Sequence, residues 1–160
     1  MIFVTVGSDL PFDRLIRHID LWADATQRSD IFAQVGSAKY VPQTISYSEF
    51  LEPSDFNRHM AEADAVVAHA GMGTILSALQ LQKPIIIFPR RTAFREIRNE
   101  HQLATARYLS ASSNIFVALD EQALLDGLNK IDTLGASDKI CDFASDQLID
   151  CIQEFIATSG

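Results

Sequence analysis

Short apolar runs alternate with segments of helical periodicity along almost the whole chain. Six apolar runs predict β-strands, at residues 2–6, 31–35, 44–47, 65–68, 85–88 and 115–117. Apolar residues at helical spacing predict helices at residues 12–22, 54–63, 74–81, 99–109, 121–131 and 138–157. Most strand runs are apolar at successive positions, which is typical of parallel strands buried on both faces. The pattern therefore predicts the α/β class, with one doubly wound parallel sheet of the Rossmann type.

Length and charge narrow the classes of protein that fit this pattern. A chain of 160 residues builds one core, so we expect residues 1–160 to form a single domain without a second full one. The net charge of −8 disfavours a nucleic-acid partner. No apolar run approaches the roughly 20 residues of a membrane-spanning helix, and residues 1–6 lack the features of a signal peptide. We therefore expect a cytoplasmic protein.

The last predicted helix, about residues 138–157, is amphipathic and contains both cysteines. Its apolar side packs either on the sheet of this chain or, in part, against a partner. Cys141 and Cys151 lie ten residues apart, or ~15 Å along a helix axis, which is too far for a disulfide. We interpret them as buried thiols of a cytosolic protein.

The clearest candidate for a ligand site is the loop at residues 69–74. Ligands of parallel sheets bind at the carboxyl ends of the strands, and here a buried strand ends at His69. Gly71 and Gly73 then precede a helix that begins near Thr74, so a phosphate can approach the backbone and the first N–H groups of the helix. The loop matches neither G-x-G-x-x-G nor a P-loop, which argues against dinucleotide redox chemistry and P-loop hydrolysis. It is also compatible with an ordinary glycine-containing turn.

The turn after the first strand repeats this arrangement. Gly7, Ser8 and Asp9 precede the first helix, and Ser8 would lie against the same ligand, although Ser and Asp are also common in plain turns. Elsewhere, no group of His, Asp and Glu has metal-ligand spacing, and no G-x-S-x-G nucleophile motif is present. We therefore predict no metal and no cofactor.

The third candidate loop is rich in arginine. Four of the nine arginines lie between residues 90 and 98, directly after the most apolar strand. The planar fork of arginine suits phosphate oxygens, and His101 and Gln102 add hydrogen-bonding groups where a helix begins. In the competing interpretation, this is a solvated loop whose arginines are balanced by Glu96 and Glu100.

Together these segments resemble the C-terminal domain of glycosyltransferase family 28. The resemblance rests on motifs in fixed order over nearly the whole chain, at residues 3–8, 12–16, 69–75, 83–84, 89 and 101–102. It is strongest to stand-alone donor-binding subunits of bacterial exopolysaccharide glycosyltransferases, which are similar to the catalytic subunit of the dolichol-linked N-acetylglucosamine transferase. Arg90, Arg91 and the run 98–102 favour the bacterial group.

The resemblance implies the C-terminal half of a GT-B enzyme. A separate, membrane-anchored subunit would supply the acceptor-binding half, and the active site would form between the two chains. The implied substrates are a UDP-sugar donor and a lipid-linked sugar acceptor in exopolysaccharide or cell-surface glycan synthesis. The chain would then be peripheral at the inner face of the plasma membrane, through its partner.

The resemblance also implies a set of substrate-binding residues. They are Gly7, Ser8, Phe50, Leu51, His69, Ala70, Gly71, Met72, Gly73, Thr74, Ser77, Arg90, Arg91, Arg98, His101 and Gln102. The turn at residues 7–8 would meet the diphosphate, the backbone of residues 50–51 would border the uracil, and residues 69–74 would hold diphosphate and sugar. Residues 101–102 would bind the sugar or the ribose. Ser77 stands where relatives often carry a carboxylate for the ribose hydroxyls.

The implied reaction is an inverting transfer, in which an acceptor hydroxyl attacks the anomeric carbon and UDP departs. Helix N–H groups and arginines would stabilise the charge on the leaving diphosphate. The general base would come from the acceptor subunit, and within this chain His69 is the candidate catalytic residue. Two alternatives stay open. One is a non-catalytic nucleotide-sugar-binding or assembly protein of the same fold, and the other is an unrelated α/β module such as a flavodoxin-like or receiver domain.

Overall fold

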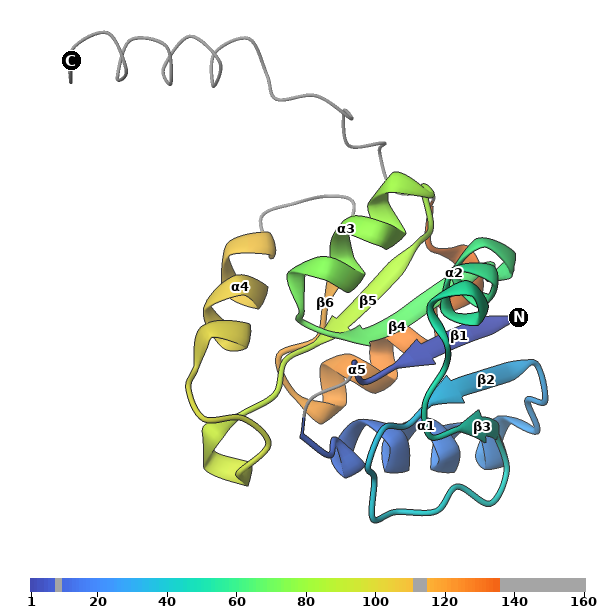
Figure 1. The fold of residues 1–160 in the computed structure, drawn as a ribbon, viewed down its shortest axis with the longest axis horizontal. Helices are drawn as coiled ribbons and strands as arrows, with labels where there is room; N and C mark the ends of the chain where they lie inside the picture. The colour runs from blue at the N-terminus through green and yellow to red at the C-terminus, as the bar shows by residue number, and fades with distance from the viewer. Residues whose placement is uncertain (8–9, 111–114, 136–160) are drawn as a thin grey trace, which may run out of the picture.

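A parallel sheet of six strands forms the centre of the molecule. The computed structural model describes residues 1–7, 10–110 and 115–135. The strands are β1 (Ile2–Thr5), β2 (Ile31–Gln34), β3 (Ser46–Ser48), β4 (Ala65–His69), β5 (Ile85–Phe88) and β6 (Phe116–Val117). Their order in the sheet is β3-β2-β1-β4-β5-β6, and every neighbouring pair is parallel (Figure 1). This arrangement confirms the predicted doubly wound α/β fold.

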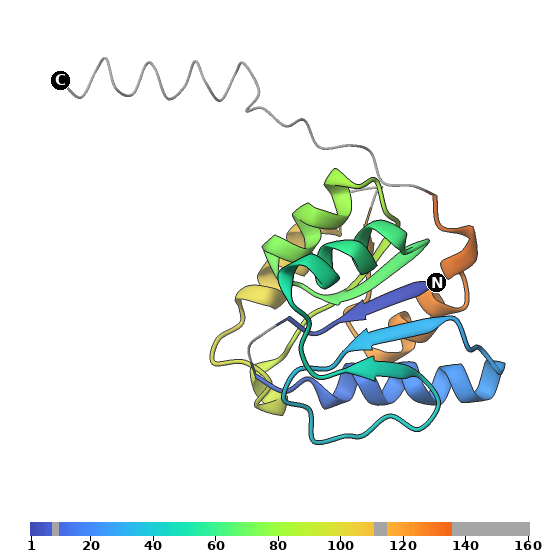
Figure 2. The same cartoon turned by 45° about the vertical axis from the view of Figure 1, so that its right-hand side comes forward.

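Helices cover both faces of the sheet. Helices α1 (Asp13–Thr26) and α5 (Glu121–Leu128) pack on one face. The other face carries α2 (Pro53–Glu62), α3 (Met72–Gln80) and α4 (His101–Leu109), as Figure 2 shows. Two short 3-10 helices, η1 (Thr92–Phe94) and η2 (Ile131–Thr133), complete the described elements.

The burial of the strands on both faces explains why apolar and polar residues do not alternate along them. Strand β1 is buried at all four positions, with Ile2 and Val4 in the core beneath α1 and Phe3 in the core beneath α2 and α3. Strand β5 is likewise buried at every position. An apolar residue is therefore required on both sides of the pleat, and the resulting uninterrupted run is visible in the sequence.

The element boundaries differ from the expected ones in a few places. Helix α2 begins at Pro53, because a proline fits the first turn of a helix, where its missing N–H is not needed. Helix α4 begins at His101, two residues later than expected, and α5 ends at Leu128 before the separate turn η2. The predicted helix at residues 138–157 and its two cysteines lie outside the described residues. No helix within the described part of the chain has the length and apolar character needed to cross a lipid bilayer.

The loop before β3 is held by one buried carboxylate, Asp20 of α1. Its two oxygens accept hydrogen bonds from the Tyr40 hydroxyl (2.7 Å) and from the N–H groups of Gln43 (2.9 Å), Thr44 (2.9 Å) and Ile45 (3.1 Å). Burial by itself raises the pKa of the Asp20 carboxyl. These hydrogen bonds, led by the one from Gln43, outweigh burial and lower the pKa below its ordinary value of 3.8.

The strand order defines where a ligand crevice is expected. The chain passes from β1 outward to β2 and β3, and then returns to the other side of β1 as β4. At such a reversal the loops leave the carboxyl ends of two adjacent strands in opposite directions, and a crevice opens between them. Here the crevice lies between the loops that follow β1 and β4.

Candidate functional site

The ring of His69, at the end of β4, lies against the loops that follow both β1 and β4. A Cβ added at Gly7 would be 2.8 Å from Cε1 of His69, and one added at Gly71 would be 2.2 Å from its Nε2. Gly7 also has a φ of +74°, which L-residues rarely adopt. The two glycines therefore make room for the imidazole ring. From the sequence, a ligand rather than a side chain is predicted to approach the backbone closely in these loops.

The turn after β1 is fixed by two hydrogen bonds of a buried hydroxyl, which donates one and accepts the other. Thr5 donates from Oγ1 to Oε1 of Gln34 (2.8 Å), and the N–H of Gly7 donates to the same Thr5 oxygen (3.2 Å). This arrangement joins the ends of β1 and β2 just below the crevice. Ser8, the next residue, lies outside the described part of the chain, so its contact with a diphosphate stays a prediction.

Helix α3 begins in the crevice with its first N–H groups unused within the helix. Gly71 is its N-cap and provides no side chain, and the first intrahelical bond runs from the N–H of Ile75 to the carbonyl of Gly71 (3.1 Å). The N–H groups of residues 72–74 therefore have no acceptor inside the helix, and the helix dipole adds positive potential there. A Cβ at Gly73 would meet nothing within 4 Å. This helix start is open and suited to an anion.

Two hollows flank the start of α3. The first, which we call the β1 hollow, has a volume of about 310 Å³ and is lined by Gly7, Gln34, Leu51, Pro53, Phe56, Asn57 and Thr74. The second, the α4 hollow, has a volume of about 480 Å³ and is lined by Ala70, Gly71, Met72, Ile97, Arg98, Asn99, His101, Gln102 and Thr105. Both volumes are in the range of small-molecule sites. The fold thus brings the loops after β1, β3, β4 and β5 together around one helix terminus.

Most of the predicted substrate-binding residues border these hollows. Those that do are Gly7, Leu51, Ala70, Gly71, Met72, Thr74, Arg98, His101 and Gln102. Gly73 is exposed at the start of α3. Phe50 is 54% exposed and its carbonyl accepts a hydrogen bond from the Ser48 hydroxyl (2.8 Å). The Ser77 hydroxyl donates to the carbonyl of Gly73 (2.9 Å), so its hydrogen is already engaged within α3.

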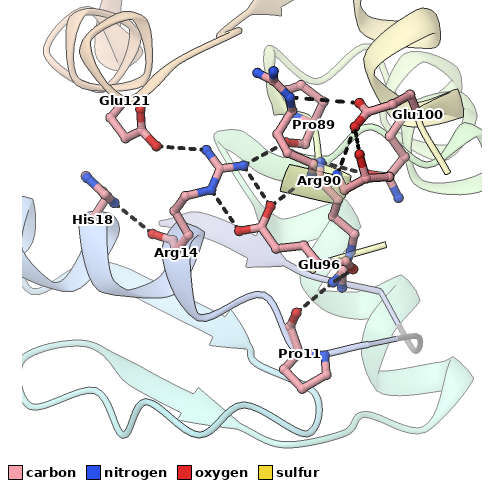
Figure 3. A network of polar contacts seen from close by, with 11 residues as sticks. Pro11, Arg14, His18, Pro89, Arg90, Glu96, Glu100 and Glu121 are labelled. Atoms are coloured by element: carbon pink, nitrogen blue, oxygen red, sulfur yellow. Dashed lines mark hydrogen bonds and ion pairs between the residues drawn. The ribbon is translucent and has the colours of Figure 1, made fainter. Parts of the chain in front are cut away.

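Arg90 differs from its predicted role. Its side chain is fully buried, and its guanidinium donates to the carbonyls of Val6 (2.8 Å), Pro11 (2.9 Å) and Glu96 (3.2 Å), as Figure 3 shows in part. The guanidinium also lies over the Phe12 ring, 4.7 Å from its centroid. Because these groups enclose the charge, the expected contact between the Arg90 side chain and a phosphate is wrong. Arg90 joins the loops after β1 and β5 from inside.

The other two predicted arginines have different surroundings. Arg91 is half-buried, its N–H donates to Oε2 of Glu96 (2.9 Å), and its guanidinium lies 3.9 Å from the Glu100 carboxylate. Hydrogen bonds from the hydroxyl and N–H of Thr92 lower the pKa of Glu100, which keeps this partner ionised. Arg91 thus matches the competing interpretation of a compensated loop. Arg98 is exposed and borders the α4 hollow.

Sequence reasoning missed Arg14, which holds the arginine-rich loop from outside. Its Nε and Nη2 donate to the two oxygens of the buried Glu96 carboxylate (2.7 and 2.8 Å), and its Nη1 donates to Glu121 of α5 (3.0 Å). Nη2 also donates to the Pro89 carbonyl (3.0 Å), as Figure 3 shows. The guanidinium lies 4.1 Å from the centroid of the Phe88 ring. Arg14 and Glu96 are separated by 82 positions, so no local pattern could have paired them. Their contact fixes the segment from which residues 97–102 enter the α4 hollow.

Gln102 is oriented by the same loop. Its side-chain oxygen accepts a hydrogen bond from the N–H of Arg90 (3.2 Å). The Gln102 amide nitrogen is therefore the end of the side chain that remains to donate toward the α4 hollow. Among the described residues, no three His, Cys, Asp or Glu side chains gather closely enough to hold a metal ion.

Comparison with known proteins identifies relatives of this fold. The model of the glycosyltransferase family 28 C-terminal domain matches residues 1–134. The chain is similar to the UDP-N-acetylglucosamine transferase subunit ALG13 of Homo sapiens (28% identity over 126 residues) and of Debaryomyces hansenii (30% over 104 residues). These alignments cover 72% and 65% of this chain, but 11% of the human protein and 38% of the Debaryomyces one. The chain thus spans a minor part of the length of these relatives.

Solved structures share the same fold. The NMR solution structure of ALG13 has a TM-score of 0.61 at 18% identity and covers 89% of this chain and 90% of that one. The crystal structure of Acinetobacter baumannii MurG has a TM-score of 0.61 at 17% identity and covers 95% of this chain and 49% of the MurG chain. At these identities the likeness concerns the fold alone.

Proposed function

Because this chain belongs to the glycosyltransferase family 28 C-terminal domain family, we propose that it is the donor-binding subunit of a UDP-sugar glycosyltransferase. A separate, membrane-anchored subunit binds the lipid-linked sugar acceptor, and the catalytic cleft forms between the two chains. The product is an exopolysaccharide or another cell-surface glycan, made at the inner face of the plasma membrane. Relatives that are named as transferase subunits support the dependence on a partner.

The observation that carries this proposal is the open start of α3 between two hollows. A UDP-sugar has a nucleoside, a diphosphate and a sugar in linear order, and this crevice offers three compartments in a row. The diphosphate lies at the N–H groups of residues 72–74, where the helix terminus favours negative charge. The uracil and ribose then occupy the β1 hollow beside Leu51, and the sugar occupies the α4 hollow.

Polar groups in the α4 hollow suit a sugar. Arg98 offers a guanidinium, His101 an imidazole and Gln102 an amide nitrogen, all bordering the same hollow. These donors and acceptors match hydroxyl groups, and the Arg98 charge also reaches toward a neighbouring phosphate. Ser77 is a weaker ribose ligand than a carboxylate, because a hydroxyl accepts fewer hydrogen bonds and lacks a negative charge.

The chemistry follows from these positions. As the acceptor hydroxyl attacks, charge accumulates on the leaving diphosphate, and preorganised N–H groups together with Arg98 stabilise it. The base that deprotonates the acceptor comes from the partner subunit. His69 lies against the glycines of both loops, so we assign it the role of shaping the diphosphate site, and it stays the candidate catalytic residue of this chain.

Gly73→Ala tests the position of the diphosphate. The added methyl group meets no protein atom within 4 Å, and alanine in a helix is favoured over glycine by about 0.5–1 kcal/mol. The variant should therefore fold at least as stably as the wild type. The same methyl group would take up open space at the helix start, where we propose that the diphosphate binds. The affinity for UDP should therefore fall about tenfold or more, a loss of about 1.4 kcal/mol per factor of ten.

Isothermal titration of the full chain with UDP and with several UDP-sugars, beginning with UDP-N-acetylglucosamine, measures this effect. The matched control is Gln80→Ala, at the other end of α3. Equal UDP affinity in the Gly73→Ala variant and in the wild type would contradict the assigned site. Transfer itself is measured as UDP release with a lipid-linked acceptor, after co-expression with the product of a neighbouring reading frame.

A further inference from the structure

A third hollow, larger than those of the donor site, lies at the same edge of the sheet but on the α1 face. This α1 hollow has a volume of about 600 Å³ and lies between the start of α1, the loop after β2 at Lys39 and the loop after β5 at residues 94–96. The loop after β5 therefore borders two hollows, with residues 94–96 lining this one and residues 97–99 lining the α4 hollow. The donor site assigned above makes no use of the α1 hollow.

The acidic residues of the α1 hollow are already engaged. Oδ1 of Asp13 accepts hydrogen bonds from the N–H groups of Lys39 (2.8 Å) and Tyr40 (3.1 Å). Both carboxylate oxygens of Glu96 accept hydrogen bonds from Arg14, and the Glu96 charge balances the charge of that arginine (Figure 3). These carboxylates therefore serve the fold of the loops around the hollow.

The remaining basic residues leave an excess of positive charge there. Arg17, Lys39 and Arg95 line the hollow with exposed side chains, and none of them forms an ion pair with an acid among the described residues. Arg17 lies over the ring of Tyr40, 5.2 Å from its centroid, a contact that orients the guanidinium without neutralising it. In a chain with a net charge of −8, such a local excess favours an anionic ligand.

The rim of the hollow adds an aromatic surface. Phe94 lines the hollow and is 56% exposed. The Arg14 guanidinium lies 4.8 Å from the centroid of the Phe94 ring. An exposed ring beside several cations suits a ligand that has phosphate groups next to a sugar or an apolar chain.

We propose that the α1 hollow is a second anion-binding site, which takes the phosphate groups of a ligand other than the donor. The site binds them through Arg17, Lys39 and Arg95. In the two-subunit enzyme the ligand is the diphosphate of the lipid-linked acceptor, an assignment that rests on the proposed function. The shared loop after β5 then separates donor and acceptor phosphates at one edge of the sheet.

The first experiment saturates the full chain with UDP and titrates it with inorganic pyrophosphate. Pyrophosphate should bind in addition to UDP, and the double variant Lys39→Gln, Arg95→Gln should weaken this binding by a factor of about ten or more, since each charge contributes on the order of a few-fold to tenfold near a protein surface. UDP affinity should be unchanged in the variant. The matched control, Lys130→Gln, removes a charge beyond the end of α5 and should leave pyrophosphate binding unchanged.

A second arm identifies the source of the phosphate. Vesicles of phosphatidylcholine with and without phosphatidylglycerol replace pyrophosphate. Binding of pyrophosphate that the double variant loses supports the diphosphate of an acceptor, whereas variant-sensitive binding to phosphatidylglycerol vesicles alone supports a lipid headgroup in the same site. The proposal is overturned if pyrophosphate only competes with UDP, or if neither ligand responds to the double variant. Failure of UDP to bind the wild type would instead refute the donor site, independently of this result.

Discussion

The contact between His69 and the glycine loops predicts a specific coupling between two positions. In Gly71→Ala the new Cβ would lie 2.2 Å from Nε2 of His69, whereas ordinary contacts of a Cβ begin at 3.4 Å. The ring must therefore shift by about 1.2 Å, and the Gly7 loop restricts this shift because it borders the same edge of the ring. Overpacking of this kind costs about 1–3 kcal/mol.

The backbone adds no further penalty at this position. Gly71 has a φ of −90° and a ψ of 128°, which alanine adopts without strain. The predicted loss for Gly71→Ala is about 2 kcal/mol, which corresponds to a fall of about 4–8 °C in the melting temperature of a domain of this size. His69→Ala alone should cost about 1 kcal/mol, mainly through lost packing.

A double-mutant cycle separates the clash from other effects. In the double variant Gly71→Ala, His69→Ala the methyl group occupies the space left by the ring, so the loss should be about 1 kcal/mol rather than the sum of about 3. Urea denaturation followed by circular dichroism gives the three free energies of unfolding. Additive losses would show that the Gly71 constraint does not act through His69, and our explanation of the two glycines would be refuted.

Three further predictions concern the loops around the site. Glu96→Gln leaves Arg14 with one oxygen instead of two, so stability should fall by about 2–3 kcal/mol in urea denaturation, and UDP-sugar affinity should fall with it because residues 97–102 lose their support. Arg90→Ala should destabilise the protein by at least about 3 kcal/mol, since buried carbonyls lose their donor, whereas Arg98→Ala should leave the melting temperature unchanged and weaken only UDP-sugar binding in titration calorimetry. The opposite assignment of these two effects would contradict the site. The lowered pKa of Asp20 stabilises the fold above its ordinary value of 3.8, and this contribution is lost as the pH falls through the folded pKa. Asp20→Asn should therefore lower stability at pH 7 and flatten its dependence on pH below about 4, and an unchanged acid limb in thermal denaturation would refute this.

The strands of the fold can be predicted from the sequence, because a strand that is buried on both faces needs apolar residues at successive positions. Strands β1, β4 and β5 are buried on both faces, and each leaves an uninterrupted apolar run. The loops of the candidate site can also be predicted from the sequence. Carboxyl ends of parallel strands share one edge, so the sequence predicts ligand loops after β4 and β5, and residues 70–72 and 97–99 of these loops border one hollow.

The chemistry of individual side chains in those loops depends on contacts across the fold. Arg90 and Arg98 belong to the same arginine-rich run of the sequence, yet Arg90 is fully buried and Arg98 borders the α4 hollow. The difference arises because the carbonyls of Val6 and Pro11, distant in the sequence, converge on Arg90. Likewise, Gly7 and Gly71 were recognised as positions of close approach, but the approaching group is the ring of His69.

The sequence by itself therefore determined the α/β class and the position of the strands, and it marked the loops of the candidate site, since periodicity and burial are properties of neighbouring residues. Only the tertiary structure decided which charged side chains are paired within the protein and which can meet a ligand. Arg14 and Glu96 neutralise each other across 82 positions, while Arg17, Lys39 and Arg95 line a hollow that no motif marks. Whether a charge is paired depends on where distant segments meet, and that is a property of the packed chain.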